Sequence, residues 1–553
     1  MSDERAAMPA TTANWWATGD YPVRPGTVVE PLVDGRAAFF AMTVAFLTAR
    51  SYILIAAWDI YAVLPLVRGG DLRIGDQEPF ERDRFVQVLR QEGLDDEAIA
   101  LWQADRLRVV DVLGFAARRG VRVGVLLWDA MHGIGHITNN PPQQRDELRA
   151  AGVDCVLDDS SRAITHMMEA LHQKCSVVDG RVAFVGGIDL TREESGDYDR
   201  WDTHQHPCAS VERESQRAPA MHPWHDVHTR ITGPAVADVR RNIVQRWADV
   251  AARRNAPVEE RWPSALPDET PPPRPEGHEA QIARTIPPKT YAFAPDGIRG
   301  IKQLYLNALM RARRFVYFEN QYLWPEAFLG LDSLRWGGRS PEMQEVLDAM
   351  MVALDRGVSL AITLPDHPNC GRKFTDGAVE DLRARARAAG AADRLHVFTL
   401  GNSEADDTML GGAFYRPVYT HAKVAIVDDA WWTAGSANLN SRGMHSDAEI
   451  NVAVADPAAA RELRLRLWNE HLHAVPRETL ADALVGLGAL DAAAAANFQH
   501  VQAREPLVGH LLPYLTASDG QRLGVPVSGE HGWLDNLPGG AGAHKPEHAG
   551  KYI

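Results

Sequence analysis

Two groups of histidine, lysine and aspartate are the residues whose types and spacing could carry out chemistry. In the second group, Lys423 follows His421 by two positions and Asp428 comes five residues later. An imidazole beside an ammonium suits reactions at an anionic centre, because the lysine can hold phosphate oxygens while the histidine attacks or moves a proton. The apolar run at residues 419–429 predicts a strand that directs His421 and Lys423 to one face.

The same spacing occurs once more, upstream. His172, Lys174 and Asp179 form this first group, and two of the seven lysines in the chain fill the repeated pattern. The string Gly186-Gly-Ile-Asp189 follows the first group much as Gly435-Ser-Ala-Asn438 follows the second. A repeated pattern that is followed each time by a similar string indicates that the chain contains two related halves.

These motifs resemble those of the phospholipase D superfamily, whose signature is a doubled histidine–lysine–aspartate motif. The resemblance covers roughly residues 25–475 and is strongest to the branch that contains the eukaryotic phospholipases D. The further strings that carry it are Arg200-Trp-Asp202, Pro223-Trp-His-Asp226, Arg230-Ile-Thr-Gly-Pro-Ala235, Gln245-Arg-Trp247, Glu319-Asn-Gln-Tyr322, and Ser441-Arg442 with Glu449.

The resemblance implies cleavage of a phosphodiester without a metal or other cofactor. One histidine attacks phosphorus and becomes phosphohistidine, and the other protonates the leaving oxygen and then activates water or an alcohol. By resemblance, His172 is the nucleophile and His421 the general acid and base; the residues alone leave this order open. The groups expected to hold the non-bridging oxygens are Lys174, Lys423, Asn438 and Ser436.

Each catalytic histidine needs a carboxylate on its far nitrogen to fix its tautomer. The positions that match the family for this role are Asp202 and Glu449. Asp179 and Asp428, although part of the signature, are expected to brace the motif loops. For Asp189, direct contact with substrate and a purely structural role as an acceptor are both open.

Other polar residues allow two interpretations. Glu319 and Gln321 either line the pocket or are buried polar residues of a strand. His222, His225 and His228 are spaced by three, which is loose for metal ligands, so we expect no metal site. The four cysteines fit neither a zinc site nor a disulfide framework and are expected to be free thiols: Cys155, Cys175, Cys208 and Cys370.

The bulk properties restrict the partners. The 553 residues carry a formal net charge of −15, which argues against a general nucleic-acid binder. The longest apolar stretch, residues 37–49, is too short to span a bilayer. The N-terminus lacks the apolar region of a signal peptide, so we expect a cytoplasmic protein or an effector exported without a signal. The expected partner is a phospholipid at a membrane surface, reached peripherally.

The two halves repeat one order of elements. Buried strands at residues 51–58 and 314–322 each follow a helix, and strands at 120–127 and 357–364 come next, before the motif. This order predicts an α/β fold of two tandem repeats, each a mixed or mostly parallel sheet flanked by helices. The resemblance to the phospholipase D superfamily implies that the two repeats pack with pseudo-two-fold symmetry.

The composition suggests five segments. Seven prolines between residues 255 and 278 indicate a stiff connector. The expected division is a loose N-terminal segment 1–24, a first repeat 25–254, the connector 255–278, a second repeat 279–475 and an extension 476–553 without an assigned role.

Three functions compete at this point. The first is a phospholipase D that cleaves the distal phosphodiester of a phosphatidylcholine-like lipid, with transfer to alcohols as a side reaction. The second is a nuclease or a phosphatidyltransferase that uses the same chemistry, and the third is a non-catalytic lipid-binding module. Residues 409–415 form either an apolar rim for the lipid or a loop that faces the core.

Overall fold

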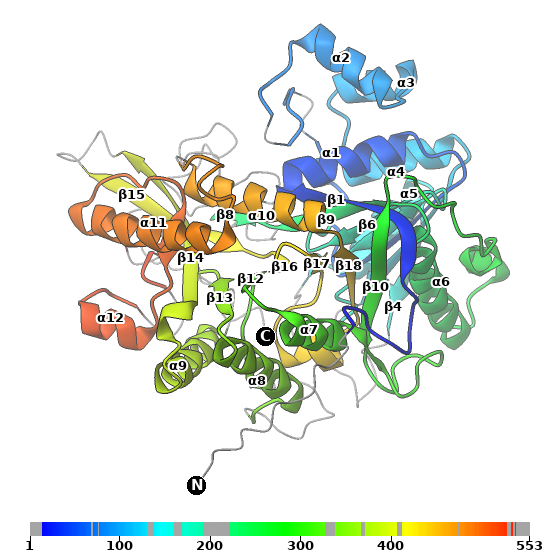
Figure 1. Ribbon diagram of the computed structural model, residues 1–553. Helices are drawn as coiled ribbons and strands as arrows, with labels where there is room; N and C mark the ends of the chain where they lie inside the picture. The colour runs from blue at the N-terminus through cyan, green and yellow to red at the C-terminus, as the bar shows by residue number, and fades with distance from the viewer. Residues whose placement is uncertain are drawn as a thin grey trace.

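The computed structural model describes residues 14–67, 70–75, 77–129, 138–159, 169–191, 198–199, 222–326, 338–366, 371–405, 412–473, 475–527, 532–534 and 537. These residues form two mixed sheets with helices on their faces (Figure 1). The first sheet has the spatial order β4 (Asp154–Asp158), β3 (Arg122–Trp128), β2 (Tyr52–Ala57), β5 (Cys175–Val178), β6 (Val182–Gly186), β9 (Val227–Thr232) and β1 (Arg24–Val33).

The second sheet repeats this arrangement strand for strand. Its order is β14 (Leu395–Ala405), β13 (Ser359–Thr363), β12 (Phe315–Asn320), β16 (Lys423–Val427), β17 (Trp431–Gly435), β18 (Glu449–Ala455) and β10 (His278–Ile286). In both sheets the first three strands are parallel and the remaining pairs antiparallel. The predicted tandem α/β repeat is therefore confirmed, and β1 joins the halves by pairing with both β9 and β10.

Helices cover the outer face of each sheet. On the first sheet these are α1 (Asp34–Leu47), α4 (Val109–Arg118) and α5 (Pro141–Ala150), with α2 (Arg82–Gln91) and α3 (Asp96–Gln103) in a projecting insertion. On the second sheet they are α7 (Gly300–Arg311), α8 (Pro341–Asp355) and α9 (Arg372–Ala388). The opposite face of the first sheet packs against α6 (Val236–Arg253), and the opposite face of the second sheet packs against α10 (Pro457–Leu472).

Because both faces of each sheet are covered, successive strand residues are buried on opposite sides. In β2, Ile53 and Ile55 join the core beneath α1 and α4. Leu54 and Ala56 join a second core that includes Trp247 of α6 and residues of both halves. An uninterrupted apolar run is the sequence pattern of a strand buried on both faces.

The ends of α10 are fixed by local sequence. Asp456 precedes the helix and its carboxylate accepts hydrogen bonds from the N–H groups of Ala458 and Ala459, at 3.0 and 3.3 Å. Pro457 occupies the first turn, where its missing N–H has no cost. The helix ends at Leu472, before His473 with a φ of 53°. This fixes the axial position of the polar residues near its C-terminal end.

The motif segments differ from the predicted continuous strand. β15 (Ala413–Thr420) ends immediately before His421, and β16 begins at Lys423. In the first half, His172 and Lys174 likewise precede β5. In both motifs the lysine ammonium donates to the carbonyl of the histidine two residues earlier: Lys423 to His421, and Lys174 to His172 at 3.0 Å.

Several remaining segments can now be placed. The Pro-rich connector contains a 3-10 helix at Val258–Ala265. The C-terminal extension contains α11 (Ala483–Ala503), β19 (Leu511–Pro513) and α12 (Ala517–Leu523), and β19 pairs with β14. The remaining described elements are the short strands β7 (Tyr198–Asp199), β8 (His222–His225) and β11 (Ile298–Arg299), a 3-10 helix at Ala392–Arg394 and a π-helix at Arg442–Ser446.

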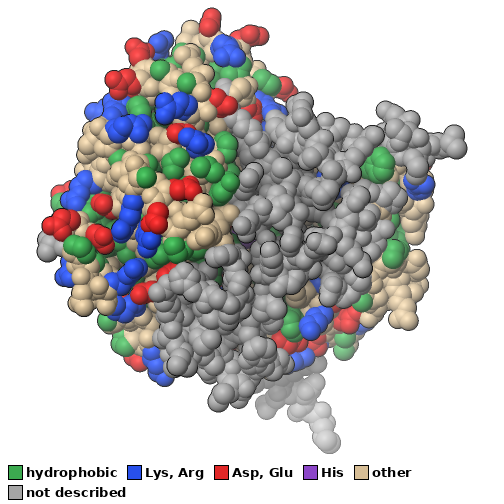
Figure 2. Space-filling view, turned by 180° about the vertical axis from the view of Figure 1, so that it is seen from behind, with side chains coloured by type: hydrophobic (Ala, Val, Ile, Leu, Met, Phe, Trp, Pro, Cys, Tyr) green, Lys and Arg blue, Asp and Glu red, His purple; other side chains and the backbone are tan. Residues whose placement is uncertain are grey.

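Two observations concern the surface. Basic and acidic side chains are interspersed over the described part of the face in Figure 2. In the part of the chain that the structure describes, no helix combines the length and the apolarity needed to cross a membrane.

The motif aspartates occupy equivalent positions at the far ends of the motif strands. Asp179 accepts hydrogen bonds from the backbone N–H groups of residues 50–52, at 2.7 to 2.9 Å. Asp428 accepts from residues 313–315 at 2.7 to 2.9 Å. Both have a positive φ, of 52° and 55°, which aspartate tolerates better than most residues. Each carboxylate thus holds the start of the neighbouring strand.

We expect Asp428→Ala and Asp179→Ala each to lower the free energy of unfolding by about 2–4 kcal/mol, because three backbone donors lose one acceptor. Chemical denaturation monitored by circular dichroism measures the loss. Asp393→Ala is the control, since this side chain is 80% exposed and should change stability by less than about 0.5 kcal/mol. Denaturation midpoints of both motif variants equal to that of the parent would contradict the bracing role.

Candidate active site

The two motif histidines lie where the halves meet, and each is held by backbone of the other half. The His172 N–H donates to the Ala448 carbonyl at 2.9 Å, beside a bridge between Leu171 and Ala448. The His421 N–H donates to the His225 carbonyl at 2.8 Å, where β15 pairs with β8. This reciprocal arrangement is the pseudo-two-fold relation expected from the repeated motifs.

The carboxylates that orient the imidazoles cross between the halves as well. His172 Nδ1 lies 2.9 Å from Glu449 Oε1, and His421 Nδ1 lies 2.6 Å from Asp226 Oδ2. With Nδ1 held in this way, Nε2 is the nitrogen that each ring presents for reaction. The two side chains keep a small exposure, 15% for His172 and 7% for His421.

The carboxylates seen on the two imidazoles match the predicted pair only in part. Glu449 contacts His172 and Asp226 contacts His421, whereas Asp202 lies outside the described residues and its role stays a prediction. Asp226 belongs to the string Pro223-Trp-His-Asp226, which already stood out in the sequence. What the sequence lacked was a reason to pair that aspartate with a histidine almost two hundred residues away.

Gly187 leaves the space that Asp226 needs. A Cβ atom on Gly187 would lie 2.0 Å from Asp226 Oδ1, far inside contact distance. That same oxygen accepts a hydrogen bond from the Val227 N–H at 2.8 Å. The glycine pair after the first motif therefore permits the close approach that directs the carboxylate to His421.

The two motif lysines have unlike partners. Lys174 Nζ lies 3.1 Å from Asp189 Oδ2. Lys423 Nζ donates to Gln321 Oε1 at 3.1 Å, and the same oxygen accepts from Asn438 Nδ2 at 3.1 Å. The described contacts of the two lysines therefore differ: Lys174 lies beside a carboxylate, and Lys423 donates to an amide oxygen that also accepts from Asn438.

Ser436 contacts a carboxylate in this structure. Its hydroxyl donates to Glu449 Oε2 and accepts from the Ile450 N–H at 3.0 Å. It thus helps to hold the carboxylate that orients His172. Asp189 also accepts from the Trp58 N–H at 3.2 Å, which ties the strand end after β2 to Lys174.

The surroundings of His172 keep its imidazole neutral. Burial lowers the pKa of His172 well below its usual value, and the nearby charges of Lys174 and Lys423 lower it further. A neutral imidazole has the lone pair that a nucleophile requires. The effect of Lys423 and His421 on this pKa also shows that the two motifs share one electrostatic environment.

Aromatic rings pack against both imidazoles. The Trp58 and His172 rings meet edge to face with centroids 6.0 Å apart, and the Trp224 and His421 centroids are 4.7 Å apart. Lys174 Nζ also lies 5.3 Å from the centroid of Trp58. These indoles limit the rotation of the histidines and exclude water from one side of the site.

Two of the three spaced histidines have different partners. His225 contacts Asp34 and Glu319, whereas His228 Nδ1 accepts from the Ile188 N–H at 3.4 Å. The side chain of His222 lies outside the described residues. A different set, His225, Glu319 and His471, places ligand atoms within 4.8 Å of one another and could geometrically hold an ion.

The remaining predictions are resolved only in part. Cys155 and Cys175 are free and buried, and burial raises the pKa of each thiol to about 12; Cys208 and Cys370 lie outside the described residues. Of the proposed apolar rim, residues 409–411 also lie outside them. Ala413 and Tyr415 pack into a core cluster with Leu512 and Trp533, which favours the core-facing interpretation.

Comparisons with known proteins agree with this geometry. A family model described as "Phospholipase D" matches residues 101–350, and one described as "Cardiolipin synthase, PLD-like domain" matches residues 339–470. Phospholipase D alpha 3 of Arabidopsis thaliana is 25% identical over 89% of this chain and 69% of its own length. Phospholipase D alpha 1 of Carica papaya is 26% identical over 82% of this chain and 65% of its own length.

The chain therefore belongs to the phospholipase D superfamily, in the branch of the eukaryotic-type phospholipases D. It spans about two thirds of the length of the curated relatives named above. Among solved structures, the phosphatidylserine synthase of Haemophilus influenzae Rd KW20 aligns with a TM-score of 0.46 and 12% identity, over 84% of this chain and 93% of that one.

The partner of His421 can be tested with Asp226→Asn. We expect kcat on a soluble reporter such as bis(p-nitrophenyl) phosphate to fall about 10²- to 10⁴-fold with little change in KM, because an amide cannot stabilise the imidazolium. Asp376→Asn is a matched control, since that buried carboxylate accepts from the Tyr514 hydroxyl at 2.8 Å. An Asp226→Asn enzyme within about threefold of the parent would exclude the assigned pairing.

Proposed function

We propose that this protein is a phospholipase D that hydrolyses the distal phosphodiester of a phosphatidylcholine-like glycerophospholipid. The products are phosphatidate and the free head group. The observation that carries the proposal is the crossed pairing of His172 with Glu449 and of His421 with Asp226. It gives one site two oriented imidazoles beside two lysines, which suits two-step displacement at phosphorus.

We assign the roles of the two histidines as the family resemblance implies, and the surroundings of His172 support this assignment. His172, whose pKa is lowered, attacks phosphorus through Nε2 and forms the phosphohistidine. His421 protonates the leaving head-group oxygen and then removes a proton from water, which attacks phosphorus and releases His172. His421 is thus an imidazolium before it protonates the head group, neutral while the phosphohistidine exists, and an imidazolium again after it takes the proton from water. The negative charge of Asp226 stabilises the imidazolium form.

The lysines stabilise the charge that develops on the non-bridging oxygens. Lys423, held by Gln321 next to Asn438, supplies one of the two positive charges. Lys174 is offset by Asp189, so its main contribution is to position the first motif. Intact motif residues in both halves argue against a non-catalytic lipid-binding module.

One assay separates this proposal from the other reactions with the same chemistry. The protein is incubated with phosphatidylcholine vesicles, with DNA, and with a phospholipid plus an acceptor such as serine. Release of choline supports the phospholipase. Cut DNA strands would identify a nuclease, and serine-dependent lipid formation without hydrolysis a phosphatidyltransferase.

The covalent intermediate leads to a prediction about alcohols. Because the phosphatidyl group stays on His172 after the head group leaves, ethanol or butanol competes with water and yields a phosphatidylalcohol. The ratio of phosphatidylalcohol to phosphatidate, measured by thin-layer chromatography, should depend on the alcohol concentration and not on which head group left. Hydrolysis that proceeds without any alcohol adduct would contradict the intermediate.

The pH profile tests the state of His172. Since its pKa lies well below the usual value of 6.5, the nucleophile stays neutral as the pH falls through 6.5. The acid limb of kcat/KM on the soluble reporter should therefore lie below pH 6.5. Measurement between pH 4.5 and 9 gives this limb, and a half-maximal point at or above pH 6.5 would contradict the assignment.

A further inference from the structure

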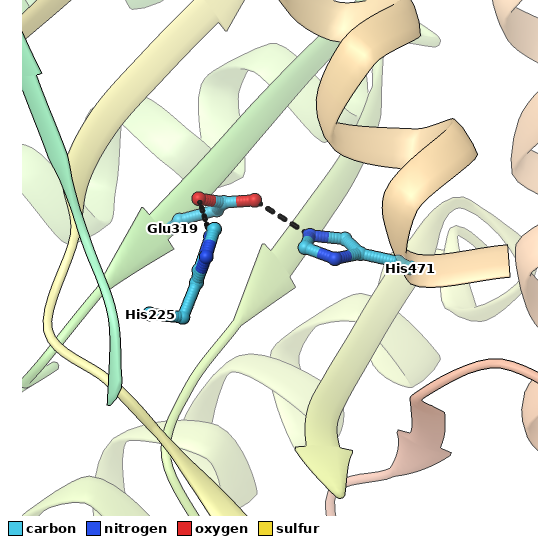
Figure 3. Close-up of side chains that lie close together, drawn as sticks. All are labelled: His225, Glu319 and His471. Atoms are coloured by element: carbon cyan, nitrogen blue, oxygen red, sulfur yellow. Dashed lines mark hydrogen bonds and ion pairs between the residues drawn. The ribbon is translucent and has the colours of Figure 1, made fainter. Parts of the chain in front are cut away.

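A buried ionic cluster lies behind the second motif. His225 of β8, Glu319 of β12 and His471 of α10 point toward one another (Figure 3). Asp34, at the junction of β1 and α1, completes the cluster from the other side of His225. All four side chains are at most 2% exposed. Burying charge is costly unless it is paired, so this arrangement needs an explanation.

The geometry fixes the protonation of His225. Its Nδ1 lies 3.0 Å from Asp34 Oδ1, and its Nε2 lies 2.9 Å from Glu319 Oε2. An ionised carboxylate can only accept, so both ring nitrogens carry protons and the ring is an imidazolium. Burial opposes this charge, but Glu319 and Asp34 raise the pKa of His225 well above its usual value.

The imidazole of His471 is neutral and donates to Glu319. Its Nε2 lies 2.8 Å from Glu319 Oε1, and burial lowers the pKa of His471. The Tyr317 hydroxyl donates to the same oxygen at 2.7 Å. Three donors thus hold the Glu319 carboxylate in one orientation.

One arm of the cluster reaches His421. Asp34 Oδ1 accepts from the Asp226 N–H at 2.9 Å, and the Asp34 N–H donates to the Asp226 carbonyl at 2.8 Å. The Asp226 side chain in turn holds His421 Nδ1, and the His225 carbonyl holds the His421 N–H. The position of the imidazole therefore depends on how residues 225–226 are held.

The other arm reaches Lys423. Glu319 is two residues before Gln321, whose side-chain oxygen accepts from Lys423 and from Asn438. A shift at the C-terminal end of β12 would move that amide and the ammonium with it.

We propose that His225, Asp34, Glu319 and His471 form a positioning unit that aligns His421 with Lys423, an inference that rests on the proposed function. The imidazolium is the link between the arms, because one cation binds a carboxylate from each half. Charge-assisted hydrogen bonds in a low-dielectric interior hold the distance between the residues they join more rigidly than apolar packing does.

Other groups face the unit without replacing its charge. From α10, Glu470 lies close to Asp34 and His225; burial, and next the charge of Asp34, raise its pKa well above its usual value, so it is a neutral acid. The positive charge of Arg466, on the same helix, opposes this rise in the pKa of Glu470. Burial raises the pKa of Tyr317, which also stays neutral. The charged members are therefore two carboxylates and one imidazolium.

The sign of the pH dependence follows from these charges. The folded pKa of His225 is raised, so its contribution to stability is fully present below 6.5 and is lost as the pH rises through the folded value. Glu319→Gln removes the charge that raises this pKa most. In that variant His225 loses its proton at a lower pH. The imidazolium that joins the two arms is then lost within the pH range of an ordinary activity profile.

The experiment compares the parent protein, Glu319→Gln, His471→Gln and the control Asp376→Asn. The kcat and KM for bis(p-nitrophenyl) phosphate are measured from pH 5.5 to 9.5, and ¹⁵N NMR of histidine-labelled protein follows the His225 ring, assigned by its absence in His225→Gln. We expect Glu319→Gln to lower kcat about 10- to 100-fold at pH 8, with KM within about threefold. A new alkaline limb should accompany deprotonation of His225. His471→Gln keeps a donor and should retain most of the activity.

Three results would overturn the positioning unit. One is a Glu319→Gln profile of the same shape as that of the parent, with only thermal stability reduced. Another is a neutral His225 ring at pH 7 in the parent protein. The third is a stoichiometric metal ion, found by elemental analysis and lost in Glu319→Gln, which would make the cluster a metal site. An inactive parent with a charged His225 would instead reject the proposed function and leave the ionic link in place.

Discussion

The exchange of carboxylates between the halves is the constraint on which the site depends. Each half supplies a histidine but receives the carboxylate for it from the other half, Glu449 for His172 and Asp226 for His421. Neither repeat can orient its own imidazole. The pairing of β1 with both β9 and β10, and the core shared by α6 and α10, are therefore requirements of the chemistry as well as of the fold.

The two repeats have the same strand order, but their motif lysines have different contacts. Lys174 is offset by Asp189, while the equivalent neighbours of Lys423 are the amides of Gln321 and Asn438. A symmetric pair of sites would give both histidines the same electrostatic environment and no division of labour. The described contacts of the motif lysines thus differ between the halves, and under the proposed two-step displacement the two histidines likewise have different roles.

The sequence predicts those features that local pattern determines. Apolar runs located β2, β3, β5, β12, β13 and β16, and the repeated order predicted the two halves, because buried strands and duplication both leave regular sequence patterns. The break between β15 and β16 at His421 was missed, since the apolar pattern runs on through it. Asp226 was passed over as the partner of His421 for a different reason. Which aspartate approaches a histidine across an interface depends on the space that Gly187 leaves, and this is a property of the folded chain.

The same reasoning explains why a charged cluster persists in the interior behind the motif. Its members come from positions 34, 225, 319 and 471, so they share no local pattern, and replacing them with apolar side chains would remove a desolvation cost. Apolar side chains would pack as well but would not fix the orientation of the Asp226 carboxylate. That carboxylate must point at one nitrogen of one imidazole, and charge-assisted hydrogen bonds fix orientation. The site thus retains buried charge where orientation, rather than stability, limits the chemistry.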